Sequence, residues 1–286
     1  MNSKIKGTVC GIFAAISYGM NPLGALNLYQ EGLNVNSVIF YRYGLATTIL
    51  ALIMLAQKKS FAITRREFAV LSVLGVLMVV SSLTLFGSFN FMDAGIASTL
   101  LFVYPVMVAV MMAIFFKEKV TSITVISIAL ALGGISLLYK GGDGATLSTV
   151  GVLLVMASSL TYAVYIIVVN KSALIMSSVK LTFYVLLIGT VILIAYSFMV
   201  TMWVYAIVLA VFPTIISLIL MVIAVHNVGS TPTAVMGALE PITAVCIGIF
   251  VFGEAFTLRL GIGIILILTA VILIVAGKSL PTQHFT

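Results

Sequence analysis

Glu240 lies near the middle of the apolar segment 232–252, where a carboxylate is costly unless it is protonated, paired or hydrated. Helical spacing places it beside Thr233 and Gly237, which belong to a small and partly polar stripe. A carboxyl group there could bind a substrate amine or exchange a proton during transport. It could also be a protonated acid that caps the helix break made by Pro241.

Arg42 is a basic residue within the apolar segment 36–56. Its guanidinium could hold the carboxylate of a substrate through paired hydrogen bonds. Its long side chain could instead reach the lipid headgroups, or hold neighbouring helices together. The residue types alone leave both interpretations open.

Polar and aromatic side chains recur at helical spacing in other apolar segments, and each pair or stripe is too polar to face lipid. They could form an aromatic, hydrogen-bonding pocket, or they could pack between helices. We predict that they bind substrate together with Glu240 and Arg42. The residues are Tyr18 and Asn21 in one segment, Tyr162 and Tyr165 in a second, and Ser81 and Thr84, with Ser88 beyond them, in a third.

The composition indicates what kind of segments carry these side chains. Of 286 residues, 63% are hydrophobic and only 7% are charged, against about 25% in a soluble domain. This balance excludes a soluble enzyme, a disordered chain and a disulfide scaffold, and it is typical of a protein that crosses the membrane many times. The net charge of +7 is spread along the chain, so we expect no nucleic-acid partner.

No grouping of residues in the sequence predicts a metal or a cofactor. The two cysteines stand alone in apolar runs, and two histidines are too few for a metal site. The chain has no Walker motif, so ATP is not the expected energy source. We also find no cluster of His, Asp and Glu near an interface, so the sequence does not predict an enzyme.

Apolar runs predict an all-α membrane protein with ten spanning helices. Of the 14 Lys and Arg residues, Lys140 and Arg259 fall in predicted external loops and Arg42 within a span, which leaves eleven on the cytoplasmic side. Both termini are therefore predicted to be cytoplasmic. The predicted spans are 7–27, 36–56, 67–89, 94–115, 122–139, 149–169, 181–200, 205–226, 232–252 and 258–276.

The chain repeats itself. A shift of 136 residues pairs Pro105 with Pro241, Glu118 with Glu254, and Ser81 with Ser217, and a shift of 144 pairs Tyr18 with Tyr162. We therefore predict two five-helix repeats, 7–139 and 149–276, followed by a cytoplasmic tail, 277–286. Because five is odd, the second repeat must insert upside down, which is typical of transporters with a substrate site at the midplane. The matched prolines Pro105 and Pro241 are predicted hinges.

The repeat and its motifs resemble the EamA family of the drug/metabolite transporter superfamily. The resemblance is carried by the Pro, Gly-Glu and Thr pattern of 241–257, its copy at 105–118, and Phe-Tyr-Arg-Tyr-Gly-Leu-Ala at 40–46. It implies a 5+5 secondary transporter, and known members include exporters of amino acids and related metabolites. Lys117 stands where the second copy has Gly253.

The expected function is export of a small amphipathic metabolite, such as an amino acid, by alternating access. Efflux of a lipophilic cation or drug through Glu240 is the alternative, and a membrane-embedded enzyme is a more distant one. Expected partners are a small-molecule substrate and the bilayer, with the protein a monomer or a weak homo-oligomer. The expected location is the bacterial inner membrane.

The predicted topology can be tested by labelling introduced cysteines from each side of the membrane. In a variant with Cys10 and Cys246 replaced by Ser, cysteines at Lys59 and Gly144 should react from opposite sides, because the loop near 58–66 is predicted inside and the loop near 141–148 outside. Labelling of both from the same side would contradict the predicted orientation.

Overall fold

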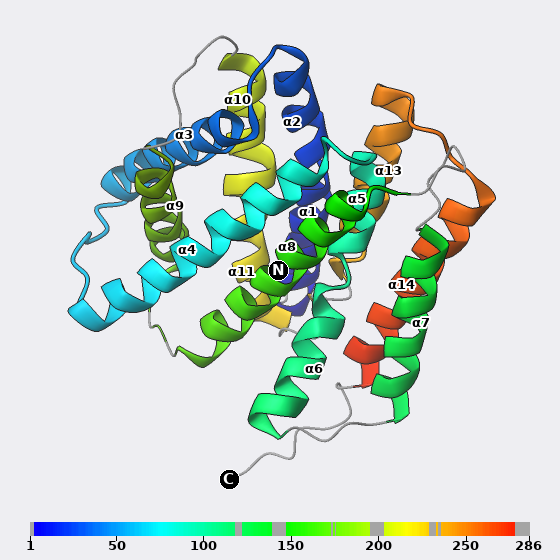
Figure 1. The fold of residues 1–286 in the computed structure, drawn as a ribbon. Helices are drawn as coiled ribbons and strands as arrows, with labels where there is room; N and C mark the ends of the chain where they lie inside the picture. Colours follow the sequence, from blue (N-terminus) through cyan, green and yellow to red (C-terminus); the bar gives the residue numbers. More distant parts are fainter. Residues whose placement is uncertain are drawn as a thin grey trace.

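The computed structural model describes residues 3–117, 122–138, 147–172, 174, 176–194, 203–228, 233 and 236–277. These residues form helices joined by short connections, and no strand occurs among them (Figure 1). The predicted tail and Glu118 lie outside the described residues, apart from Gly277.

The helices follow the predicted spans in chain order. Those of the first half are α1 (Ser3–Gly19), α2 (Asn21–Gln30), α3 (Val35–Ala56), α4 (Arg65–Ser88), α5 (Ala94–Leu101), α6 (Tyr104–Phe116) and α7 (Ser122–Leu138). Those of the second half are α8 (Thr149–Lys171), α9 (Ser178–Ile194), α10 (Trp203–Ala210), the π-helix η1 (Val211–Ile216), α11 (Ser217–Val228), α13 (Leu239–Phe252) and α14 (Leu258–Gly277).

Helices long and apolar enough to cross a membrane recur along the chain. Among the described residues, six reach that length, and the shorter apolar helices fall in the remaining predicted spans, so the count of ten crossings stays a prediction. The six are Ile5–Gln30, Val35–Ala56, Arg65–Ser88, Ala94–Phe116, Thr149–Asn170 and Ile207–Val225. The shorter ones are Val125–Ile135, Ser178–Ile194, Leu239–Phe252 and Leu258–Leu273.

Several of the predicted spans are interrupted near their prolines. The segment 94–115 is divided into α5 and α6, which begins at Tyr104 just before Pro105. Proline lacks an N–H and clashes with the carbonyl four residues earlier, here that of Leu101, so α5 ends at that residue. The same rule applies at Pro241, which follows a turn at Gly237 and precedes most of α13.

Each helix packs on a partner from the other half of the chain. In the predicted repeats, the spans of α1, α3 and α4 in the first half correspond to those of α8, α9 and α10–α11 in the second. The contact of α1 with α11 then corresponds to that of α8 with α4, and the contact of α3 with α10 corresponds to that of α9 with α4. The pairs α3 with α9, α5 with α13, and α7 with α14 each map onto themselves. Figure 1 shows α7 and α14 side by side on one flank. The contact pattern is therefore consistent with a two-fold relation between the halves.

Two hydrogen bonds repeat at matched positions. The Ser217 hydroxyl donates to the carbonyl of Ala14 at 3.0 Å, and the Ser81 hydroxyl donates to the carbonyl of Ser158 at 3.2 Å. The serines are related by the shift of 136 and the acceptors by the shift of 144 found in the sequence. This correspondence supports our assignment of two copies of one unit, whose boundaries remain a proposal.

The distribution of side chains is that of a protein dissolved in lipid. Large apolar side chains are exposed on the outside, such as Phe250 at 84% and Leu258 at 80%, while Arg42 and Glu240 are buried at 1% and 4% exposure. Apolar outer surfaces are stable against hydrocarbon, whereas charges are stable only in the interior. The protein is thus a multi-pass membrane protein whose polar chemistry lies in its centre.

The close packing of α7 on α14 can be tested by comparing two neighbouring glycines of α7, Gly134 and Gly133. A Cβ atom added at Gly134 would lie 2.6 Å from Cγ1 of Ile267 and 2.9 Å from the carbonyl of Gly263, whereas one added at Gly133 meets nothing within 4 Å. Gly134→Ala should therefore destabilise the protein by about 1–3 kcal/mol. Gly133→Ala should leave it unchanged or slightly more stable. Thermal unfolding in detergent measures both, and equal melting temperatures would contradict the packing.

Candidate functional site

Aromatic rings from both halves meet in the centre of the protein. Tyr18 of α1 and Tyr162 of α8 stack with ring centroids 6.4 Å apart, and Tyr165 stacks on Tyr162 at 5.9 Å. Tyr104, the first residue of α6, packs edge-on against Tyr162 at 4.8 Å. The structure therefore brings together three predicted tyrosines and a fourth that the sequence analysis missed.

Tyr104 could have been found from the repeat. The shift of 136 that pairs Pro105 with Pro241 also pairs Tyr104 with Glu240. The two repeats thus place a phenol and a carboxyl at matched positions, each directly before a proline. The missing step was to ask what stands at the matched position.

Glu240 lies in the first turn of α13 and is buried against α1. A Cβ atom at Gly19 would lie 2.6 Å from the Glu240 carbonyl, so only a glycine lets the two helices approach this closely. The Glu240 carboxyl is close enough to Tyr18, Tyr104 and Tyr162 to interact with them electrostatically. Within the described residues it forms no ion pair.

Arg42 is buried and bound to the π-helix η1. Its Nε donates to Oγ1 of Thr214 at 2.5 Å, and its Nη2 donates to the carbonyl of Pro213 at 3.5 Å. The guanidinium also lies over the ring of Phe86, 5.2 Å from its centroid, in a cation–π contact. Of the alternatives left open by the sequence, the one in which the side chain reaches the lipid headgroups is wrong, because the guanidinium is buried and points into the protein.

Tyr18 is the residue that connects the two charges. Both the Glu240 carboxyl and the Arg42 guanidinium interact electrostatically with its hydroxyl. Arg42 and Glu240 are not paired with each other, and no other described acid neutralises Arg42. The centre therefore holds a buried cation and a buried carboxyl group near one tyrosine, and each lacks a charged partner there.

Asn21 begins α2, just after the break in the first span at Met20. It is 3% exposed, and its Oδ1 has no hydrogen-bond partner among the described residues. A buried amide oxygen without a donor is costly, and it indicates a position where a ligand donor could be accepted. Helix α2 contacts α13, which carries Glu240.

Ser81 and Thr84 lie at the boundary between α4 and α8. Ser81 exchanges hydrogen bonds with Ser158, and Thr84 donates to carbonyls of its own helix at Val80 and Ser81. Ser88 likewise donates to Leu85. No recorded contact joins these hydroxyls to the tyrosines, so their part in binding stays a prediction.

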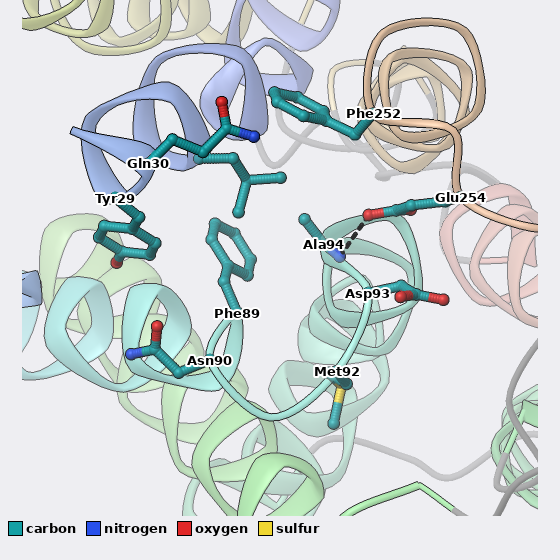
Figure 2. Close-up of a pocket in the computed structure, with 10 residues that line it drawn as sticks. Tyr29, Gln30, Phe89, Asn90, Met92, Asp93, Ala94, Phe252 and Glu254 are labelled. Atoms are coloured by element: carbon teal, nitrogen blue, oxygen red, sulfur yellow. Dashed lines mark hydrogen bonds between the residues drawn. The ribbon is translucent and has the colours of Figure 1, made fainter. Parts of the chain in front are cut away.

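A cavity of about 440 Å³ lies at the end of the bundle that is predicted to be external. Figure 2 shows Glu254 on one side of it, with its carboxylate directed at the start of α5, and Tyr29 and Phe89 on the other. The Glu254 oxygens accept the backbone N–H groups of Ala94 at 2.9 Å and Gly95 at 3.2 Å. This carboxylate joins the start of α5 to the C-terminal end of α13.

The described residues contain no group of three or more His, Cys, Asp and Glu side chains that could hold a metal ion. The chemistry of the centre is instead that of charge, hydrogen bonding and aromatic contact. It can bind a small polar molecule, and no described constellation pairs a nucleophile with a base.

The fold and this centre define a polytopic helical membrane protein that shields opposite charges from lipid. The sequence model of the EamA-like transporter family matches residues 5–140 and again residues 149–276, and the chain belongs to that family. The resemblance noted in the sequence is therefore confirmed, together with membership of a transporter family.

No curated protein matches the chain. A solved structure titled "Crystal structure of protein" superposes with a TM-score of 0.68 at 15% identity, and the match covers 94% of this chain and 96% of the other. That likeness shows a shared fold.

Glu254 gives a prediction with a defined pH dependence. Burial raises the pKa of Glu254, and the Asp93 carboxyl raises it further, while the bonds from Ala94 and Gly95 act in the opposite direction. The folded state then binds the proton more tightly than the unfolded state, so the stability contributed by this group is greatest below its ordinary pKa and falls as pH rises through the folded value. Replacing Glu254 with Ala should cost about 1 kcal/mol through the lost helix cap.

That cost should be smaller at pH 8 than at pH 5. Thermal unfolding of wild type and Glu254→Ala at both pH values measures the difference. The exposed Glu67→Ala serves as a control for general pH effects on a helix-capping carboxylate, and its own pKa is shifted downward by the bonds with Thr64. A Glu254→Ala cost that grows with pH would contradict the assigned direction.

Proposed function

We propose that the protein is a secondary transporter that exports a small amphipathic zwitterion of the amino-acid class. One observation carries this proposal: Arg42 and Glu240 are both buried, both interact with Tyr18, and neither has a charged partner among the described residues. Burying unpaired charges is expensive. A ligand with a carboxylate and an ammonium group would compensate both.

The carboxylate end of such a ligand fits the side of the centre near Arg42. A guanidinium pairs with a carboxylate through two parallel hydrogen bonds. The Arg42 side chain is held in place by Thr214, Pro213 and Phe86, which supports this assignment.

The ammonium end fits the carboxyl of Glu240 and the free Oδ1 of Asn21. The rings of Tyr18, Tyr104 and Tyr162 would surround the apolar part of the ligand. This arrangement gives the ligand two distinguishable ends. It therefore supports an amino acid over a phosphate ester, which would require several basic side chains.

Alternating access would proceed by motion of the two repeats about the centre, with Pro105 and Pro241 as hinges. Helix breaks at matched positions support this, since α5–α6 and the segment leading into α13 bend next to Tyr104 and Glu240. Glu240 could exchange a proton for the substrate as the site faces each side in turn. We place the protein in the bacterial inner membrane with both termini cytoplasmic.

Efflux of a lipophilic cation is the second candidate. It is favoured by the tyrosine rings around a single carboxyl, which resemble an aromatic cage for a quaternary ammonium group. In that case Arg42 would hold helices together and would not contact the ligand. The two candidates therefore differ in what they require of Arg42.

Flux in proteoliposomes separates these functions. Under an imposed pH gradient, Glu240→Gln should lose uphill transport of an amino acid by about tenfold or more, because a neutral amide cannot carry the proton. Exchange should persist if Glu240 only carries the proton, and it should weaken at every pH if the carboxylate also pairs with the substrate ammonium. Arg42→Gln should weaken amino-acid transport by about tenfold or more and spare cation transport. The exposed Glu67→Gln and Arg259→Gln serve as controls. Cation flux that needs Glu240 but not Arg42 would establish the alternative, and normal uphill flux in Glu240→Gln would exclude both functional roles.

A further inference from the structure

Thr214 is fully buried in η1, directly after Pro213. Because Pro213 has no N–H, the carbonyl of Leu209, four residues earlier, loses its normal helical donor. The Thr214 hydroxyl donates to that carbonyl at 2.9 Å. The Thr214 hydroxyl thus supplies a side-chain donor to a carbonyl at the start of the π-helix.

The same hydroxyl accepts the bond from Nε of Arg42. A hydroxyl has one hydrogen, and here that hydrogen is committed to Leu209, so the lone pairs of Oγ1 are left for Arg42. The direction of the chain of bonds is therefore fixed, from Arg42 through Thr214 to Leu209. The Tyr18 hydroxyl also hydrogen-bonds the guanidinium of Arg42, but it belongs to α1 and is not tied to η1.

These contacts set the orientation of the guanidinium. Its Nε and Nη2 are held by η1 and its face lies on Phe86, so one edge of the fork and one face are already used. An arginine has five N–H groups, and the remaining ones lie at the other end of the fork, on Nη1 and Nη2. The Tyr18 hydroxyl hydrogen-bonds the guanidinium and also interacts with Glu240. The N–H groups that Thr214, Pro213 and Tyr18 do not use are therefore the ones available to a ligand carboxylate.

We propose that Thr214 is a positioning residue that sets the preference of the site for ligands with a carboxylate. The inference rests on the proposed function, since it assigns the carboxylate to Arg42. Without the hydroxyl, the Leu209 carbonyl and the Arg42 Nε–H both lose their partners in a region without bulk water. The guanidinium then turns toward the unpaired carbonyl, and the free end of its fork leaves its position beside Tyr18.

The first test compares two ligands that differ only in the carboxylate, L-leucine and 3-methylbutylamine, by their Kd for the purified full-length protein. Thr214→Val removes the hydroxyl at similar volume and should reduce the preference for leucine over the amine by about tenfold, since bonds to charged groups are the strong ones. Thr214→Ser keeps the hydroxyl and should keep the preference. Thr190→Val is the matched control, because Thr190 also donates to a carbonyl of its own helix but does not touch Arg42.

Equal weakening of both ligands in Thr214→Val, or loss of the preference in Thr214→Ser, would show a structural role only and overturn the proposal. Thr214→Ala supplies a second hydroxyl-free variant if valine disturbs packing. The ratio of the two affinities is insensitive to the fraction of protein that is folded, so partial misfolding does not imitate the expected result.

The second test needs no ligand. Nitrogen-15 labelling of arginine gives four Nε–H signals, and that of Arg42, assigned with Arg42→Lys, should exchange slowly with solvent, unlike those of the exposed Arg65, Arg66 and Arg259. Thr214→Val should abolish this protection and Thr214→Ser should retain it. Protection that persists in Thr214→Val overturns the positioning. If protection depends on Thr214 while the wild type shows no preference for leucine, the proposed function fails and the positioning of Arg42 stands.

Discussion

A membrane provides no water to a backbone carbonyl that has lost its hydrogen-bond donor, and the centre of this protein is organised by that constraint. Pro105 frees the carbonyl of Leu101, which accepts the hydroxyl of Ser159 from α8 at 3.1 Å. Pro213 frees the carbonyl of Leu209, which accepts Thr214. Each proline thus creates an irregular helix and also a requirement for a polar side chain beside it. The polar groups cluster where the helices break because each freed carbonyl needs a hydrogen-bond donor from a nearby side chain.

The two repeats place different polar residues beside their helix breaks, and this makes the centre asymmetric. The matched prolines Pro105 and Pro241 follow a tyrosine in one repeat and Glu240 in the other, while the π-helix of the second repeat binds Arg42 of the first. A scaffold of nearly equivalent halves therefore encloses a cation and a carboxyl at different places. A ligand with two unlike ends can bind such a centre in one orientation. Near-equivalent halves are also what alternating access requires, since the two end states must have similar free energies.

Charge in an apolar run is visible in a sequence, and this is why Glu240, Arg42 and the repeat could be predicted. Tyr18, Tyr162 and Tyr165 could be predicted because they are polar and recur at helical spacing in apolar segments, whereas Tyr104 has no such partner in its own segment. Thr214 was not found, because its importance depends on Arg42, which is 172 positions away in the chain. Ser81 and Thr84 look identical to site residues in the sequence, yet their hydroxyls are used by α8 and by their own helix. Helix breaks were anticipated from proline, but their location depends on which carbonyl the ring displaces, so α5 ends at Leu101, before the proline itself.

The cavity at the predicted external end is separated from the buried charges by aromatic side chains that Arg42 itself contacts. Phe89 lines the cavity and stacks on Phe86 at 5.5 Å, and Phe86 lies beneath the guanidinium. The Tyr29 hydroxyl, also at the cavity, donates to the carbonyl of Phe86 at 2.9 Å. The wall on this side and the residue proposed to bind the carboxylate are therefore one connected unit. The ring of Phe86 stabilises the Arg42 charge through the cation–π contact. A carboxylate bound at Arg42, as proposed above, would therefore bind a guanidinium that already packs against this wall.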